Sequence, residues 1–158
     1  MQKPIPIDLA QFSAAQVAEI ADTTIKVIAT WTTRDFAGRR DPRVKRGGGV
    51  ARRYSLRDAL WFALAAQLHR RYHTPLPQLQ AIARLTFGGA FTPERAAFVV
   101  VASARPGSAS THYCPDIAAV ASQIQRLGCA IIVIDAREMF GRVMQGARLM
   151  LSEKERAA

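Results

Sequence analysis

The chain has 158 residues, and a hydrophobic content of 49% is enough for a folded core and excludes a chain that is disordered throughout. Its 22 Lys and Arg outnumber its 12 Asp and Glu, and the net charge of +10 predicts a polyanionic partner. Cys114 and Cys129 form no CxxC pair, which argues against a structural zinc site or a disulfide scaffold. With no signal-peptide pattern and no apolar run near the roughly 18 residues of a membrane-spanning helix, we expect a cytoplasmic protein.

The positive charge is unevenly spread along the chain. Residues 1–95 carry a net charge of +8, whereas residues 96–158 carry +2. The first part therefore has the character of a module that binds a polyanion, and the second part need not touch that partner. We predict two domains, over residues 1–88 and 96–158.

The first predicted element is a short helix that begins after Ser13. Ser13 is a favourable N-cap, and Gln16 is placed three residues later to return a hydrogen bond to its backbone, which completes a capping box. Phe12 and Val17 have the spacing of a hydrophobic staple. We expect this helix to run to about Ala21 with Val17 facing inward.

A second helix is predicted over about 24–33, because the Asp and Thr residues at 22–24 form a polar break and are good N-caps. The apolar spacing places Ile25, Ile28 and Ala29 on its inward face. Two short helices joined by a tight polar turn form a helix-turn-helix, whose second helix enters the major groove. The outward positions would be Thr23, Thr24, Lys26, Val27 and Thr30, followed by Arg34. Their hydroxyls and positive charge suit base edges and phosphates, although a helical pair buried as core is the alternative.

The most basic stretch is residues 34–57, which hold nine Lys or Arg and two Asp and so carry +7 of the net +10. Burying so many positive charges is costly unless a partner supplies negative charge. The planar guanidinium group of Arg is well suited to bind phosphate, because it presents several hydrogen-bond donors in a fork. Val44 and Arg53 bracket Gly47–Gly49, which predicts a hairpin that would serve as a wing beside the helix-turn-helix. Its contacts to the DNA backbone or minor groove would be Arg39, Arg40, Arg43, Lys45, Arg46, Arg52 and Arg53. The alternative is a solvated loop.

Two further helices complete the first domain. The third is expected over about 56–72, with Ser55 as its N-cap and Asp58 as the acid three residues later. The fourth is expected over about 76–86. Their apolar faces are predicted to consist of Leu56, Leu60, Trp61, Leu64 and Leu68 in the third helix and Leu79, Ile82 and Leu85 in the fourth.

In this order of elements, residues 12–86 resemble the winged helix-turn-helix of MerR-type transcriptional regulators. The resemblance rests on FSAAQVAEIADTTIKVIATW, the Gly/Arg-rich stretch, ARRYSLRDALWFALAAQL and LPQLQAIARL, and covers about half of the chain. It implies that Thr23, Thr24, Lys26 and Thr30 lie near the groove and that Arg52, Arg53 and Tyr54 lie on phosphate. The wing is longer than is usual in that family, and a long dimerising helix and an effector-site cysteine are not evident. Coiled-coil dimerisation and metal or drug sensing are therefore not implied.

In the second domain, continuous apolar runs typical of buried strands alternate with helical patterns. We predict strands over 97–103 and 129–135, a loop over 104–115, and helices over 116–127 and 137–151. The inward residues of the first of these helices are expected to be Ile117, Val120, Ala121 and Ile124, and Asp135 is expected to cap the second. This order predicts a βαβα unit with parallel strands, and an α+β class for the whole chain. Because two parallel strands leave both sheet edges open, we expect the sheet to be completed in a homodimer through residues 96–151.

The segment 104–116 collects polar side chains after the first predicted strand, where α/β folds bind ligands. It contains Ser108, Ser110, Thr111, His112, Tyr113, Cys114 and Asp116. Cys114 and His112 are only two residues apart, whereas catalytic partners usually converge from distant segments. We therefore expect no enzyme activity, no cofactor and no metal, and we leave a small-molecule effector site open.

Three functions compete on these grounds. The leading prediction is a sequence-specific transcriptional regulator that binds double-stranded DNA as a homodimer. The second is an architectural or excisionase-type accessory protein, which would bind and bend DNA. The third is a ligand-sensing or enzymatic domain over residues 96–151 carried by a DNA-binding module. A regulator should prefer its site over random duplex by a factor of about 10³ or more.

Overall fold

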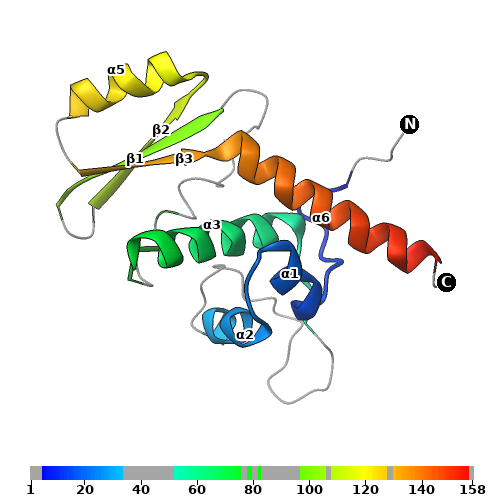
Figure 1. Ribbon diagram of the computed structural model, residues 1–158. Helices are drawn as coiled ribbons and strands as arrows, with labels where there is room; N and C mark the ends of the chain where they lie inside the picture. The colour runs from blue at the N-terminus through cyan, green and yellow to red at the C-terminus, as the bar shows by residue number, and fades with distance from the viewer. Residues whose placement is uncertain are drawn as a thin grey trace. The chain divides into compact units, whose positions relative to one another are not determined.

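The computed structural model shows an α+β chain (Figure 1). It describes residues 5–33, 52–75, 78–79, 82, 97–105, 108–127 and 130–156. Within these residues there are five helices and three strands. They are α1 (Ala14–Ile20), α2 (Ile25–Thr33), α3 (Leu56–Tyr72), β1 (Phe98–Arg105), β2 (Ser108–Cys114), α5 (Ile117–Leu127), β3 (Ala130–Asp135) and α6 (Ala136–Arg156).

The chain divides into two compact units. Unit 1 comprises Met1–Gln67 and Arg142–Ala158, and unit 2 comprises Leu68–Gly141. Both boundaries fall inside helices, α3 and α6, so each of these helices contributes to both units. The sequence placed the division near residues 88–96 instead, and it assigned the whole of the last helix to the second domain.

The core of unit 1 is built around α3, because this helix is apolar on nearly every side. Every side chain from Ala59 to Ala66 is at most 9% exposed. A helix that is apolar all round is normally surrounded by other elements. The five residues predicted for its inward face are all buried, which confirms that prediction. Leu79 and Ile82 of the predicted fourth helix, which belong to unit 2, are buried too, whereas Leu85 lies outside the described residues.

The last part of α6 belongs to unit 1 through its contact with α1. Val143 and Ala147 are fully buried on one stripe of α6. A Cβ built on Gly146 would lie 3.5 Å from Cγ1 of Ile20, which is an ordinary van der Waals contact. The helix also ends at Arg156, beyond the predicted end at residue 151.

Unit 2 contains a three-stranded antiparallel sheet in the order β2-β1-β3. The outermost pairs are Phe98 with Cys114 and Arg105 with Ser108 between β1 and β2, and Phe98 with Asp135 and Ser103 with Ala130 between β1 and β3. Helix α5 covers one face, where Val120 packs with Val100 and Cys114 (Figure 1). Val99 and Val101, on the other face, are equally buried. β1 is therefore buried on both faces.

The predicted parallel βαβα unit is wrong, because residues 108–114 form strand β2 rather than a loop. β2 runs antiparallel to β1 and is separated from it by Pro106 and Gly107, a dipeptide typical of turns. Helix α5 then leads from the Cys114 end of the sheet to Ala130 at the other end, so β3 also pairs antiparallel with β1. The third strand is supplied by the same chain, which removes the reason for expecting a second copy to complete the sheet.

The residues of α5 that face the sheet differ from those that the sequence predicted. Val120 is buried as expected, but Ile117 and Ile124 are 67% and 41% exposed, and Ala121 is exposed as well. Ala119 and Leu127 pack against the core beside Val120. The helix therefore carries apolar residues on two sides, and three of the four that the sequence assigned to the core lie on the outside.

Candidate nucleic-acid interface

Helix α1 begins and ends with local hydrogen bonds that the sequence encodes. The Ser13 hydroxyl accepts a hydrogen bond from the Gln16 N–H at 3.3 Å, and the Ser13 N–H donates to Gln16 Oε1 at 2.9 Å, so the capping box is confirmed. Phe12 and Val17, the predicted staple, are both fully buried. This fixes the point at which the chain enters the helix pair.

The turn from α1 to α2 is closed by two backbone bonds at the end of α1. The Thr23 N–H donates to the Ala18 carbonyl at 2.8 Å, and the Asp22 N–H donates to the Glu19 carbonyl at 3.1 Å. Asp22 has φ = 52°, in the left-handed region. This is the Schellman arrangement, in which Asp occupies the position that glycine usually takes. A four-residue turn therefore sets the direction of α2.

The start of α2 is capped by Thr24, one of the three residues at 22–24 that were predicted as possible N-caps. The Thr24 hydroxyl accepts a hydrogen bond from the Val27 N–H at 3.3 Å. One turn later, the Thr30 hydroxyl donates to the Lys26 carbonyl at 2.8 Å. Both side chains are exposed.

The buried face of α2 differs from the predicted one. Ile28 and Trp31 are buried, at 0% and 8% exposure, but Ile25 is 54% exposed and Ala29 is exposed as well. The prediction that Ile25 and Ala29 face inward is therefore wrong. Five of the first seven positions of this nine-residue helix are apolar, so its pattern fits more than one rotation.

The exposed face of α2 carries most of the predicted groove contacts. Thr24, Lys26 and Thr30 are exposed, Thr23 is half-buried, and Val27, predicted to face outward, is half-buried. Ile25 and Ala29 join this face, and no single-sequence pattern singled them out. The structure thus brings hydroxyl, ammonium and methyl groups together on one side of a short helix.

Tyr54 anchors α2 to the segment that precedes α3. Its backbone forms an antiparallel bridge with Phe12, in which the Tyr54 N–H donates to the Phe12 carbonyl at 2.8 Å. The Tyr54 hydroxyl lies 3.1 Å from the Thr32 hydroxyl on α2, and its ring meets the Phe62 ring edge-on with centroids 5.9 Å apart. Phe62 in turn stacks on Trp31 of α2. Tyr54 is only 4% exposed, so it lies in the core of unit 1.

Of the basic residues predicted to contact DNA, the structure describes only Lys26, Arg52 and Arg53. Arg53 is exposed, and the Arg52 guanidinium lies over the Tyr54 ring, 5.7 Å from its centroid. This places the end of the basic stretch beside the residue that anchors α2. Outside the described residues lie Arg34, Arg39, Arg40, Arg43, Lys45 and Arg46.

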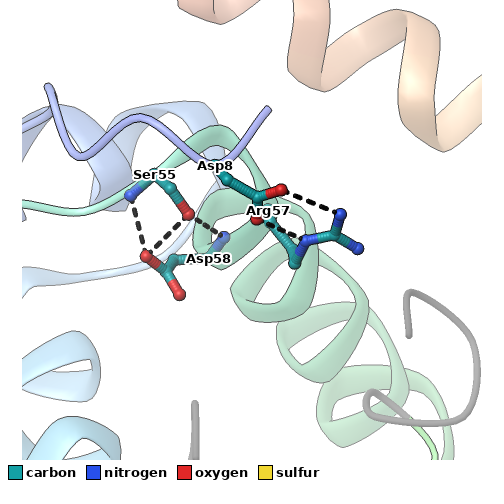
Figure 2. A network of polar contacts seen from close by, with 4 residues as sticks. All are labelled: Asp8, Ser55, Arg57 and Asp58. Atoms are coloured by element: carbon teal, nitrogen blue, oxygen red, sulfur yellow. Dashed lines mark hydrogen bonds and ion pairs between the residues drawn. The ribbon is translucent and has the colours of Figure 1, made fainter. Parts of the chain in front are cut away.

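A polar network holds the first turn of α3 (Figure 2). Asp58 Oδ2 accepts hydrogen bonds from the Ser55 N–H at 2.7 Å and from the Ser55 hydroxyl at 2.8 Å, which confirms the predicted cap. Arg57 forms a two-bond ion pair with Asp8, at 2.8 Å from Nε and 3.3 Å from Nη2 (Figure 2). The Arg57 N–H also donates to the Ile7 carbonyl at 2.9 Å, so the N-terminal segment is tied to α3.

The described polar side chains of segment 104–116 lie along β2 and at the start of α5. Ser110 and His112 lie two residues apart on β2, with Oγ and Nε2 3.2 Å apart. Cys114 is fully buried, and burial raises the pKa of its thiol, as does the negative charge of Asp116. A buried, protonated thiol is a poor nucleophile. Asp116 and Asp135 accept hydrogen bonds from the N–H groups of Ala119 and Glu138, respectively, and act as helix caps.

The described residues contain neither a cluster of metal ligands nor a membrane-spanning helix. No cluster of three or more His, Cys, Asp or Glu is placed to hold a metal ion among them. Within the same residues, no helix has both the length and the apolar character needed to cross a membrane. Comparison with known proteins adds no assignment, since no family model and no curated protein matches the chain.

Proposed function

We propose that this chain is a sequence-specific, DNA-binding transcriptional regulator that acts as a homodimer. The observation that carries the proposal is the exposed face of α2, which presents Thr24, Lys26 and Thr30 after a four-residue turn from α1. In helix-turn-helix proteins, the second helix of such a pair enters the major groove, and hydroxyl and ammonium groups hydrogen-bond to base edges there. The resemblance of residues 12–86 to MerR-type regulators supports the same assignment.

The charge of the chain supports a nucleic acid as the partner. Residues 34–57 carry +7, and Arg53, at the described end of this stretch, is exposed. Phosphate contacts supply most of the affinity and position a protein on DNA, whereas base contacts supply the specificity. We assign the first role to Arg52, Arg53 and the wing residues before them, and the second role to α2. Because Tyr54 is buried against Thr32, its role in this proposal is to hold α2 rather than to bind phosphate.

A homodimer agrees with an uncharged apolar stripe on α5. Ile117, Ala121 and Ile124 are exposed and lie within about 60° of one another around the helix axis, at 100° per residue. Residues 117–125 include no charged side chain, although the chain as a whole carries +10. A second copy can therefore approach this surface with little charge repulsion, and the pair would present two recognition helices to two half-sites.

Substitutions on α2 and in the wing should act differently on DNA binding. We expect Lys26→Ala or Thr24→Ala to reduce the preference for a selected site over random duplex by about tenfold, since a good base contact is worth roughly 1–3 kcal/mol of discrimination. Arg53→Ala should weaken binding about equally on all duplexes and flatten the log–log salt dependence by about one unit. Fluorescence-anisotropy titrations at several salt concentrations measure both quantities.

The matched control is Arg126→Ala, which removes one exposed positive charge from α5 in unit 2. It should change the discrimination between sequences by less than about twofold. It should change the slope of the log–log salt dependence by less than about 0.3 unit. If Lys26→Ala and Arg53→Ala act identically, α2 does not read bases. If the wild-type protein binds duplex with no sequence preference, the architectural role replaces that of a regulator.

A further inference from the structure

The exposed face of α2 consists of two rows of side chains that differ in chemistry. With 100° between successive residues, Ile25 and Ala29 lie 40° apart and form one row, and Lys26 and Thr30 form a second row beside it. All four side chains are exposed, and Ile28 and Trp31 point into the core from the opposite side. One row is therefore apolar and the other polar, over the same two turns.

The apolar row occupies the part of α2 that would approach base edges most closely. Ile25 is the first residue of the helix, and Ala29 follows one turn later. In a helix-turn-helix, the N-terminal residues of the second helix contact the bases. The apolar group that the major groove offers is the C5-methyl of thymine, and Ala and similar small apolar surfaces pack against it.

We propose that Ile25 and Ala29 read thymine methyl groups in the major groove, which makes them specificity-determining residues of the DNA site. This inference rests on the proposed function. Four residues of helix span about 6 Å, and base pairs are spaced about 3.4 Å apart along each strand, so the two thymines should lie one to two base pairs apart. The polar row would contact the acceptors next to them, Lys26 at guanine O6 or N7 and Thr30 at either kind of edge.

Uracil substitution tests this inference, because uracil differs from thymine only by the missing methyl group. The probe is a duplex selected from a random pool, remade with uracil in place of each thymine, one position at a time. We expect the wild-type protein to bind about fourfold more weakly when a contacted methyl is removed. This is the loss in affinity that corresponds to the burial of one methyl-sized group. Positions outside the contact should change affinity by less than 1.5-fold.

Ile25→Ala should abolish the uracil effect at one position in each half-site and leave the other positions unchanged. The matched control is Leu9→Ala, because Leu9 and Ile25 are both 54% exposed and both belong to unit 1, but Leu9 lies outside α2. Leu9→Ala should retain the wild-type uracil profile at every position. Thermal unfolding of the two variants should shift by less than 2 °C, since neither side chain is buried.

The outcomes separate this inference from the proposed function. If a sequence is selected but no uracil position matters, or if Ile25→Ala weakens thymine and uracil duplexes equally, the methyl-reading role is excluded and the DNA-binding function stands. If no sequence is selected, the proposed function fails, and the role of Ile25 and Ala29 fails with it.

Discussion

Tyr54 connects three parts of unit 1 through three different groups. Its backbone pairs with Phe12, its hydroxyl lies 3.1 Å from that of Thr32 on α2, and its ring contacts Phe62 on α3. The bond to Thr32 restricts how α2 can shift relative to the other two parts. In the proposed function, Tyr54 would therefore serve DNA recognition by positioning α2, without touching DNA itself.

Tyr54→Phe separates the positioning role from a phosphate contact. The substitution keeps the ring and removes the hydroxyl, which leaves the half-buried Thr32 hydroxyl without this partner. We expect the free energy of unfolding to fall by about 1 kcal/mol in urea denaturation, the usual loss for one such hydrogen bond. The salt dependence of DNA binding should stay unchanged. A flatter salt dependence with unchanged stability would instead place Tyr54 on phosphate.

Residues whose partners lie within one turn were predictable from the sequence. Ser13, Ser55, Thr24 and Asp135 cap their helices as expected, because a cap depends only on the residue types two or three positions apart. The ion pair between Asp8 and Arg57 was not predictable, since 49 residues separate its partners and many other acids and bases have the same charges.

Among the elements, α3 depends on a cap that is itself buried. Ser55 is 2% exposed, and its hydroxyl both donates to Asp58 Oδ2 and accepts from the Asp58 N–H at 3.2 Å. The Asp58 carboxylate also lies in the first turn, where it complements the helix dipole. Removal of the hydroxyl would leave the Asp58 N–H without this acceptor, whereas Asp58 Oδ2 would keep its hydrogen bond from the Ser55 N–H.

We expect Ser55→Ala to lower the free energy of unfolding by about 1–2 kcal/mol, the range for loss of an N-cap. The control is Ser122→Ala on α5, where an exposed hydroxyl donates only to the Ala118 carbonyl within the helix. This control should stay within about 0.5 kcal/mol of the wild type, because surface changes away from caps and cores usually do. Urea denaturation followed by circular dichroism measures both, and equal losses would contradict a special role for the cap.

The elements that were predicted wrongly have patterns that fit two structures. β2 has the sequence SASTHYC, whose polar residues resemble a loop, and its strand character becomes evident only through pairing with the apolar β1. α2 and α5 each carry apolar residues on more than one side, so the pattern fixes the helix but not its rotation. In both helices, packing against neighbours in the fold selects the buried side.

At the scale of the whole molecule, self-association remains a prediction, with α5 as its surface. We expect sedimentation velocity to show a dimer at concentrations of micromolar to tens of micromolar, because three exposed side chains form a small interface and stable ones bury about 1,200–2,000 Å². Ile117→Glu should shift the protein to monomer, since two like charges would meet in an apolar contact. The control is Leu149→Glu, because the Leu149 side chain on α6 is also exposed, at 55%. This control should leave the oligomeric state unchanged. A wild-type monomer throughout this range would rule out the homodimer.

The division of the chain into units depends on contacts that no local pattern reveals. The sequence predicted the α+β class correctly, because class follows from the types of elements. The grouping of the last part of α6 with α1 depends instead on contact between residues far apart in the sequence, such as Gly146 and Ile20. Such long-range packing arises only when the elements are assembled.

The central claim is that the exposed face of α2 reads a DNA sequence, and selection from a random duplex pool followed by a salt series tests it most directly. The account predicts that selection converges on two related half-sites. It also predicts a log–log salt slope that corresponds to about six or more phosphate contacts and a preference of about 10³ or more over random duplex. Salt-sensitive binding without a selected sequence, or no duplex binding at moderate salt, would contradict it.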